Sequence, residues 1–172
     1  MSGYGDKPFG LREVKLHPLP SGTAVALPVD RVLKFKETVQ SGTLRGGDKI
    51  AAVVSVADAA EFELEAGGIS LEAYALMTGR TVTTSGTTPN QTTTLAGAAQ
   101  KAFPYFKVIG RALGDGSDDI RVTLFKCKLT DGLSGDFQDG QFFMSACKGI
   151  AVDDTVNGVY EFQQRETAAA LP

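Results

Sequence analysis

The sequence predicts a mostly β protein, a sandwich or barrel with one short flanking α-helix. Polar and apolar side chains alternate with a period of two along much of the chain, and pairs of glycine and aspartate separate the alternating runs. The 172 residues are 42% hydrophobic and 22% charged, which suits one domain with a sizeable core. We therefore expect a single domain over residues 1–172.

Two segments, 31–39 and 61–66, alternate most clearly. Every second side chain in them is apolar, as in a strand with one buried face. Further strands are expected at 105–113, 120–129, 142–152 and 159–165, with weaker candidates at 11–16 and 23–27 inside an N-terminal arm of residues 1–30. The expected core residues, from these strands and from the helix, are Leu33, Phe35, Phe62, Leu64, Leu71 and Tyr74.

One segment, 71–78, has the signals of a helix. Ser70 stands where an N-cap is needed, and Leu71 and Tyr74 begin an apolar stripe at helical spacing. Gly79 follows at the position where a left-handed residue ends a helix. Residues 81–94 come next, and eight of these fourteen are threonine. Because glycine and proline interrupt this stretch, we expect a polar hairpin or flexible loop there.

The residues that usually carry catalysis or bind metals are scarce. Cys127, Cys147 and the single His17 are too few for a zinc site or a convincing catalytic triad. The run 115–119 resembles a calcium loop weakly, but Ile120 stands where such a loop needs glycine, so a solvated turn is favoured. We expect no enzymatic activity, no cofactor and no metal.

Charge and hydropathy narrow the class further. The formal net charge of −3 argues against a basic face that grips nucleic acid. The longest apolar run, 50–57, is too short to span a bilayer, and no secretion signal is expected. Residues 58–72 hold five acidic side chains and no lysine or arginine. They either pair across strands with Lys34 and Lys36 or form a surface that repels polyanions.

Several phrases, taken in order, resemble the major tail tube proteins of long-tailed bacteriophages. They are the run Leu-Arg-Gly-Gly-Asp at 44–48, the block 61–79, and the runs 136–143, 149–151, 158–162 and 165–168. The likeness covers roughly residues 30–168, and 81–100 matches least.

The resemblance implies a small β-sandwich or barrel with a flanking helix, six copies of which close a ring whose joined sheets line a central bore. Stacked rings would form a tail tube that conducts double-stranded DNA during genome ejection. The implied partners are further copies of the chain, the passing DNA, a tape-measure protein, and terminator and baseplate or tip proteins, with no membrane. The implied location is the virion tail, assembled in the cytoplasm of the host bacterium.

Two groups of site residues follow from this expectation. Because an acidic wall would not bind passing DNA, the candidates for the bore are Glu61, Glu63, Glu65 and, more weakly, Asp48. A loop at 40–48 is the candidate for ring stacking, with a plain hairpin connection as the alternative. Its residues are Gly42, Thr43, Leu44, Arg45, Gly46 and Gly47.

A monomeric β-sandwich that binds or decorates a surface is the alternative function. The sequence has no Trp and only four Tyr, so it is poor in the aromatic platforms with which such modules usually hold sugars.

Overall fold

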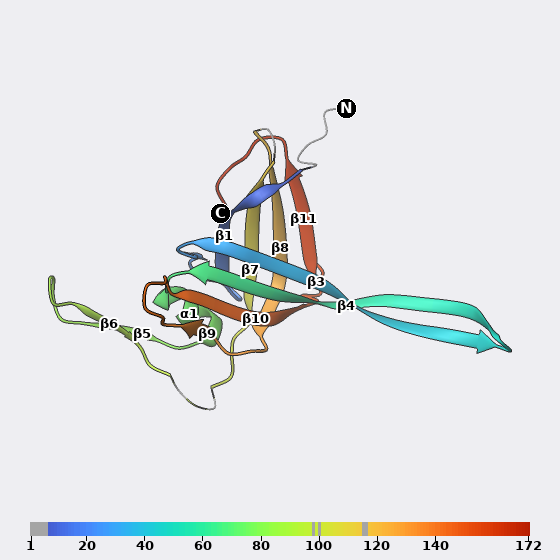
Figure 1. The fold of residues 1–172 in the computed structure, drawn as a ribbon, viewed down its shortest axis with the longest axis horizontal. Helices are drawn as coiled ribbons and strands as arrows, with labels where there is room; N and C mark the ends of the chain where they lie inside the picture. The colour runs from blue at the N-terminus through green and yellow to red at the C-terminus, as the bar shows by residue number, and fades with distance from the viewer. Residues whose placement is uncertain (1–6, 98, 100, 115–116) are drawn as a thin grey trace.

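The computed structural model describes residues 7–97, 99, 101–114 and 117–172, and it is a mostly antiparallel β structure (Figure 1). The described elements are β1 (Phe9–Pro18), β2 (Val25–Ala26), β3 (Asp30–Gly46), β4 (Lys49–Gly67), α1 (Leu71–Thr78), β5 (Val82–Ser85), β6 (Thr92–Leu95), β7 (Phe106–Leu113), β8 (Asp119–Leu129), β9 (Ser134–Asp136), β10 (Met144–Val152) and β11 (Tyr160–Arg165).

The main sheet folds over on itself as a sandwich, as the sequence predicted. Its strand order is β2-β1-β7-β8-β10-β4-β3, with β9 added to β10 and β11 added to β8. Because β8 pairs with β11 along its first half and with β10 at its end, the sheet changes direction there. Strands β3, β4 and β10 thus cross over β1, β7, β8 and β11 (Figure 1).

The core lies between these two layers. Phe62 of β4 meets Phe106 of β7 edge to face, with ring centroids 6.1 Å apart. A Cβ on Gly149 would overlap the Phe62 ring, so glycine at this position lets β10 lie close to that ring. Among the expected core residues, Phe62 and Leu64 are buried, while Leu33, Phe35 and Tyr74 pack against the core from half-buried positions.

Helix α1 has the predicted bounds but a different buried face. The Ser70 hydroxyl accepts a hydrogen bond from the Ala73 amide at 3.2 Å, and Gly79 ends the helix with φ 67°. Ala73 and Met77 are buried, whereas Leu71 is only half-buried and lies outside the core cluster. Apolar side chains lie on nearly every side of this two-turn helix, so their spacing does not select the buried face.

The strand candidates at 11–16 and 23–27 are confirmed as β1 and β2, and they belong to the main sheet rather than to a separate N-terminal arm. Strand β1 pairs with β7 along its length and with β2, and its Val14 and Leu16 are among the most buried side chains. Two register shifts near the start of β1 interrupt its alternation, which explains the weak strand pattern there. Residues 1–6 of the arm lie outside the described part of the chain.

The threonine-rich stretch forms the polar hairpin that was one of its two expected states. Strands β5 and β6 pair as a separate two-stranded sheet that projects from the body beside α1 (Figure 1). Threonine suits such a solvated ladder because its branched side chain favours an extended backbone.

Residues 169–171 are held against β1, β7 and β8 by buried charges. Arg121 donates to the Ala169 carbonyl at 2.6 Å, and the Ala169 amide donates to Asp119 at 3.1 Å. Asp119 is fully buried and forms a 3.3 Å ion pair with Arg121, while Leu171 is 4% exposed. The charges are tolerated inside the protein because they pair with each other and with the main chain.

We predict that Asp119→Ala lowers the free energy of unfolding by about 3–5 kcal/mol, because it leaves the buried Arg121 without its carboxylate. Urea denaturation followed by circular dichroism measures this change. Glu161→Ala, at an exposed position on β11, is the control and should cost less than about 0.5 kcal/mol. Equal effects of the two substitutions would contradict the role given to Asp119.

Candidate functional site

The most distinctive surface is a β-ribbon that leaves the sandwich. Strands β3 and β4 continue together beyond the body as a two-stranded arm, here called the projecting hairpin (residues 39–57; Figure 1). The arm begins at a β-bulge, where Thr38 pairs with Ala59 and Val39 with Ala57, so that Asp58 has no opposite residue. Gln40 donates to the Asp58 carboxylate at 3.0 Å across this bulge.

Both faces of the projecting hairpin carry exposed apolar side chains. Because opposite residues of an antiparallel pair share a face, the register places Leu44, Val54 and Val56 on one face and Val39 and Val53 on the other. Their exposed fractions lie between 50% and 66%. Nothing in the described chain covers them, since every residue from 39 to 57 is exposed.

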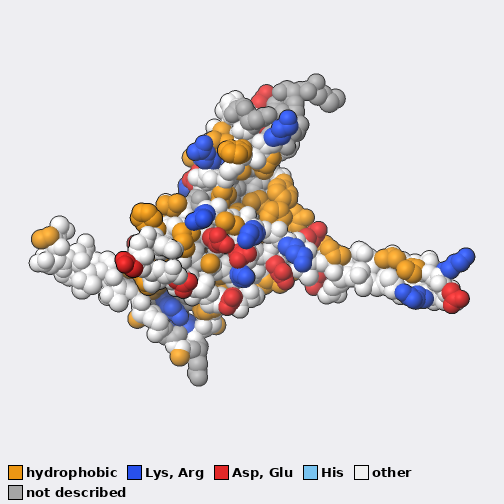
Figure 2. All heavy atoms as spheres, viewed as in Figure 1, with side chains coloured by type: hydrophobic (Ala, Val, Ile, Leu, Met, Phe, Trp, Pro, Cys, Tyr) orange, Lys and Arg blue, Asp and Glu red, His pale blue; other side chains and the backbone are white. Residues whose placement is uncertain are grey.

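The expected loop at 40–48 is wrong in its boundaries. Residues 40–46 belong to β3 and pair with β4, and only Gly47 and Asp48 form the turn. Gly47 adopts φ 63°, which the tight turn requires. Five of the six residues expected for ring stacking therefore lie in the outer end of the ladder, and Gly47 lies in its turn. Positive and negative side chains gather at this end of the projecting hairpin (Figure 2).

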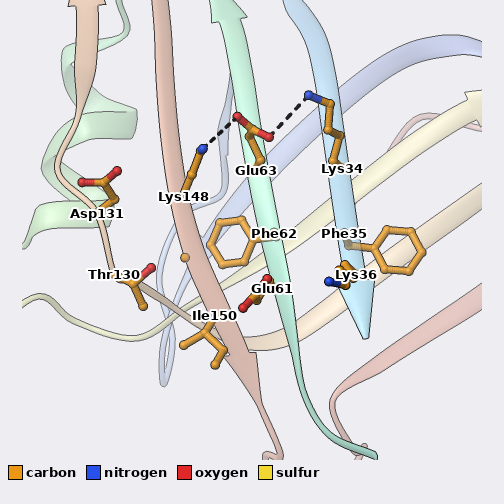
Figure 3. Close-up of a pocket in the computed structure, with 11 residues that line it drawn as sticks. Lys34, Phe35, Lys36, Glu61, Phe62, Glu63, Thr130, Asp131, Lys148 and Ile150 are labelled. Atoms are coloured by element: carbon orange, nitrogen blue, oxygen red, sulfur yellow. Dashed lines mark hydrogen bonds and ion pairs between the residues drawn. The ribbon is translucent and has the colours of Figure 1, made fainter. Parts of the chain in front are cut away.

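The three glutamates expected in a bore lie in line on the outward face of β4, but they are not alone there. Lysines of both neighbouring strands reach Glu63, with Lys34 of β3 at 3.4 Å and Lys148 of β10 at 3.6 Å (Figure 3). Lys34 also lies 4.0 Å from Glu65. Glu63, Lys34 and Lys148 border an open hollow of about 860 Å³. The strand pairing therefore makes a face of mixed charge out of an acidic stretch of sequence.

The structure confirms cross-strand pairing for Lys34. Lys36 stands opposite Glu61 in the register, but neither forms an ion pair within the described residues. The sequence did not identify Lys148 as a partner of Glu63, because the two residues become neighbours only when β10 pairs with β4. Asp48 is not brought to the three glutamates, since about 40 Å of strand separates it from Glu61.

The neighbouring lysines shift the acidity of Glu63. Desolvation acts to raise the pKa of Glu63, but the hydrogen bond from Lys34 and the positive charges of Lys148 and Lys34 outweigh it. The pKa of Glu63 therefore lies below its usual value, and the carboxylate is charged at neutral pH.

A second exposed apolar surface lies where β9 turns into β10. In this segment, here called the aromatic loop (residues 137–143), the rings of Phe137 and Phe142 are 82% and 96% exposed. Phe143 packs against Phe137 with ring centroids 4.5 Å apart. Asp136, at the end of β9, and Asp139, within the loop, are also exposed. The sequence signal for this surface is the presence of three phenylalanines in a segment rich in turn residues.

The described residues offer little for metal binding or nucleophilic chemistry. Within them, no three His, Cys, Asp or Glu side chains form a group that could hold a metal ion. Cys127 and Cys147 are buried free thiols, and burial raises the pKa of Cys147 to about 12. Asp115 and Gly116 of the expected turn lie outside the described residues. No described helix is both long and apolar enough to cross a membrane.

Comparison with known proteins gives a loose structural likeness. No protein-family model matches the sequence, and no curated protein matches it. Among solved structures, the chain is similar to one in the cryo-EM structure of the baseplate of the anti-feeding prophage, symmetrised six-fold. The TM-score is 0.47 at 14% identity, and the match covers 95% of this chain and 97% of the other.

We predict that replacing both Lys34 and Lys148 by alanine raises the pKa of Glu63 toward its ordinary value, because the charges that stabilise its carboxylate are removed. An NMR titration of the side-chain carboxyl carbons measures this. Lys36→Ala is the control and should leave the pKa of Glu63 unchanged, and a rise of equal size in that variant would contradict the pairing.

Proposed function

We propose that this chain is a non-catalytic structural subunit of a phage-tail-like assembly, and that it joins further copies of itself through the projecting hairpin. The observation that carries the proposal is the apolar character of both faces of that hairpin. An isolated two-stranded ribbon is marginally stable in water, so this one gains most when another chain covers it.

The energy available from covering the hairpin is considerable. Six large apolar residues of the hairpin are at least half exposed: Val39, Leu44, Ile50, Val53, Val54 and Val56. Burying what is still exposed of each stabilises an assembly by about 1 kcal/mol per residue. The total over the six residues is comparable with the free energy of unfolding of a small domain. A monomer does not gain this free energy, because the six side chains stay exposed to water.

More specifically, we propose that the assembly is the tail tube implied by the sequence resemblance. It would consist of six-membered rings, enclose a bore for double-stranded DNA and form part of the virion tail. The other proposed partners are those of a tail, namely a tape-measure protein and terminator and baseplate proteins. The mixed-charge face of β4 is compatible with a wall that DNA passes, because Lys34 and Lys148 are partnered by Glu63 instead of being free for phosphates.

We predict that the wild-type chain assembles into rings or filaments as its concentration rises, and that Leu44→Asp combined with Val56→Asp abolishes this. The two carboxylates would lie on the covered face and would have to be desolvated. Light scattering after size exclusion and negative-stain microscopy measure the outcome. Val156→Asp, at an 85% exposed apolar side chain outside the hairpin, is the control and should assemble normally. A wild-type chain that stays monomeric would favour the alternative function, a monomeric β-sandwich that binds or decorates a surface.

We further predict that replacing Glu61, Glu63 and Glu65 by lysine creates DNA binding that the wild-type chain lacks. The three new lysines would join Lys34, Lys36 and Lys148 on one basic face and release counterions from the duplex. Mobility shifts at two salt concentrations measure this binding and its salt dependence. Glu72, Glu161 and Glu166 changed together to lysine give the same net charge at other exposed positions. Equal binding by both triple variants would exclude a special role for this face.

A further inference from the structure

We infer that the aromatic loop is the surface that receives the projecting hairpin of a second copy, so that copies associate head to tail. This inference rests on the proposed function, which requires only that the hairpin be covered by another copy. It adds the receiving surface and the polarity of the contact.

The two surfaces lie at opposite ends of the same strand. Lys49 starts β4 at the tip of the hairpin, and Gly67 ends it opposite Met144, the residue after the aromatic loop. Eighteen steps of extended backbone separate these ends by about 60 Å. The hairpin leaves one side of the body and the β9–β10 connection lies on the other, beside α1 (Figure 1). A copy that uses one surface therefore keeps the other free.

The two surfaces are alike in apolar character. The hairpin offers Leu44, Val54 and Val56 on one face, and the loop offers Phe137 and Phe142, the more exposed of which is 96% accessible. Phenylalanine contributes a large contact area with few rotatable bonds, so it loses little conformational entropy when it is covered. The two exposed phenyl rings of the aromatic loop are therefore suited to contact the apolar face of the projecting hairpin.

The charges at the rims of the two surfaces are complementary. In sequence, Asp136 precedes Phe137 and Asp139 lies between the two exposed phenylalanines. The tip of the hairpin carries Arg45, Asp48 and Lys49, so its net charge is positive. None of these five charged side chains forms an ion pair within the described residues. Opposite charges at the rim of an apolar contact favour the correct partner and its orientation. A hairpin against a second hairpin would instead bring together two tips of net positive charge.

A contact between two different surfaces has a structural consequence. Because hairpin and loop are not the same patch, the contact does not stop at a pair of copies, as a two-fold contact does. Each added copy presents a new free surface, so repetition produces a closed ring or an open filament. The arrangement on β4 thus determines which kind of assembly the chain can form.

Two complementary variants test the inference. Val54→Asp removes the hairpin surface and Phe142→Asp removes the loop surface, and both positions are exposed, so the fold should survive. Each variant alone should be monomeric where the wild-type chain assembles. An equimolar mixture should form a one-to-one dimer and nothing larger, because one intact hairpin meets one intact loop. Sedimentation velocity distinguishes these species, and the mixture should associate at least tenfold more tightly than either variant alone.

The outcomes separate this inference from the proposed function. If the Phe142→Asp variant assembles like the wild type, or if the mixture stays monomeric while the wild type assembles, the head-to-tail contact is wrong and self-association stands. A wild-type chain that does not assemble overturns both. Phe9→Asp, at an 85% exposed phenyl ring on β1, controls for the loss of any exposed aromatic side chain and should assemble normally.

The rim charges allow a second test that does not alter the apolar contact. Arg45→Glu combined with Lys49→Glu should weaken assembly, and adding Asp136→Lys and Asp139→Lys to the same chain should restore it. Failure of the second pair to restore assembly would show that these charges do not face each other.

Discussion

A two-stranded ribbon cannot bury its own side chains, and this constraint governs how the molecule can work. In the sandwich, β4 has one face in the core, where Phe62 and Leu64 are buried. Beyond the bulge at Asp58 the same strand has no second layer, yet its side chains become more apolar instead of less. A continuous apolar run is typical of a strand covered on both faces. The described residues supply no such cover, and this is the basis of the proposed association with further copies.

The sandwich gives the hairpin a fixed direction. The same two strands that form the arm continue into the body, where β4 pairs with β10 as well as with β3. The projecting hairpin is therefore an extension of the sheet. Its strands stay paired to the tip, with register shifts at Thr38/Val39 and Leu44/Arg45. A contact made at the tip is thus connected to the body through one ladder of backbone hydrogen bonds.

The features predicted well from the sequence are those whose signals are local. Ser70 and Gly79 cap helix α1 through residues within one turn, so both its ends were correct. The features missed depend on contacts between distant residues. Lys148 meets Glu63 only because β10 lies beside β4, and Val14 is buried only because β7 pairs with β1. The glycines at 42 and 46 suggested a loop. In the structure both belong to β3, because β4 pairs with that segment and holds it extended.

The distribution of charge along β3 indicates where association is permitted. This strand is the last in the sheet order, so its outer edge has unpaired backbone groups that could bind another chain. In the body it carries Lys34, Lys36 and Glu37, and charged side chains on an edge strand oppose pairing with other strands. From Val39 to Leu44 it carries no charge at all. The protection against association thus stops where the projecting hairpin begins, which is expected if that segment is selected to meet a partner and the body is selected to avoid one.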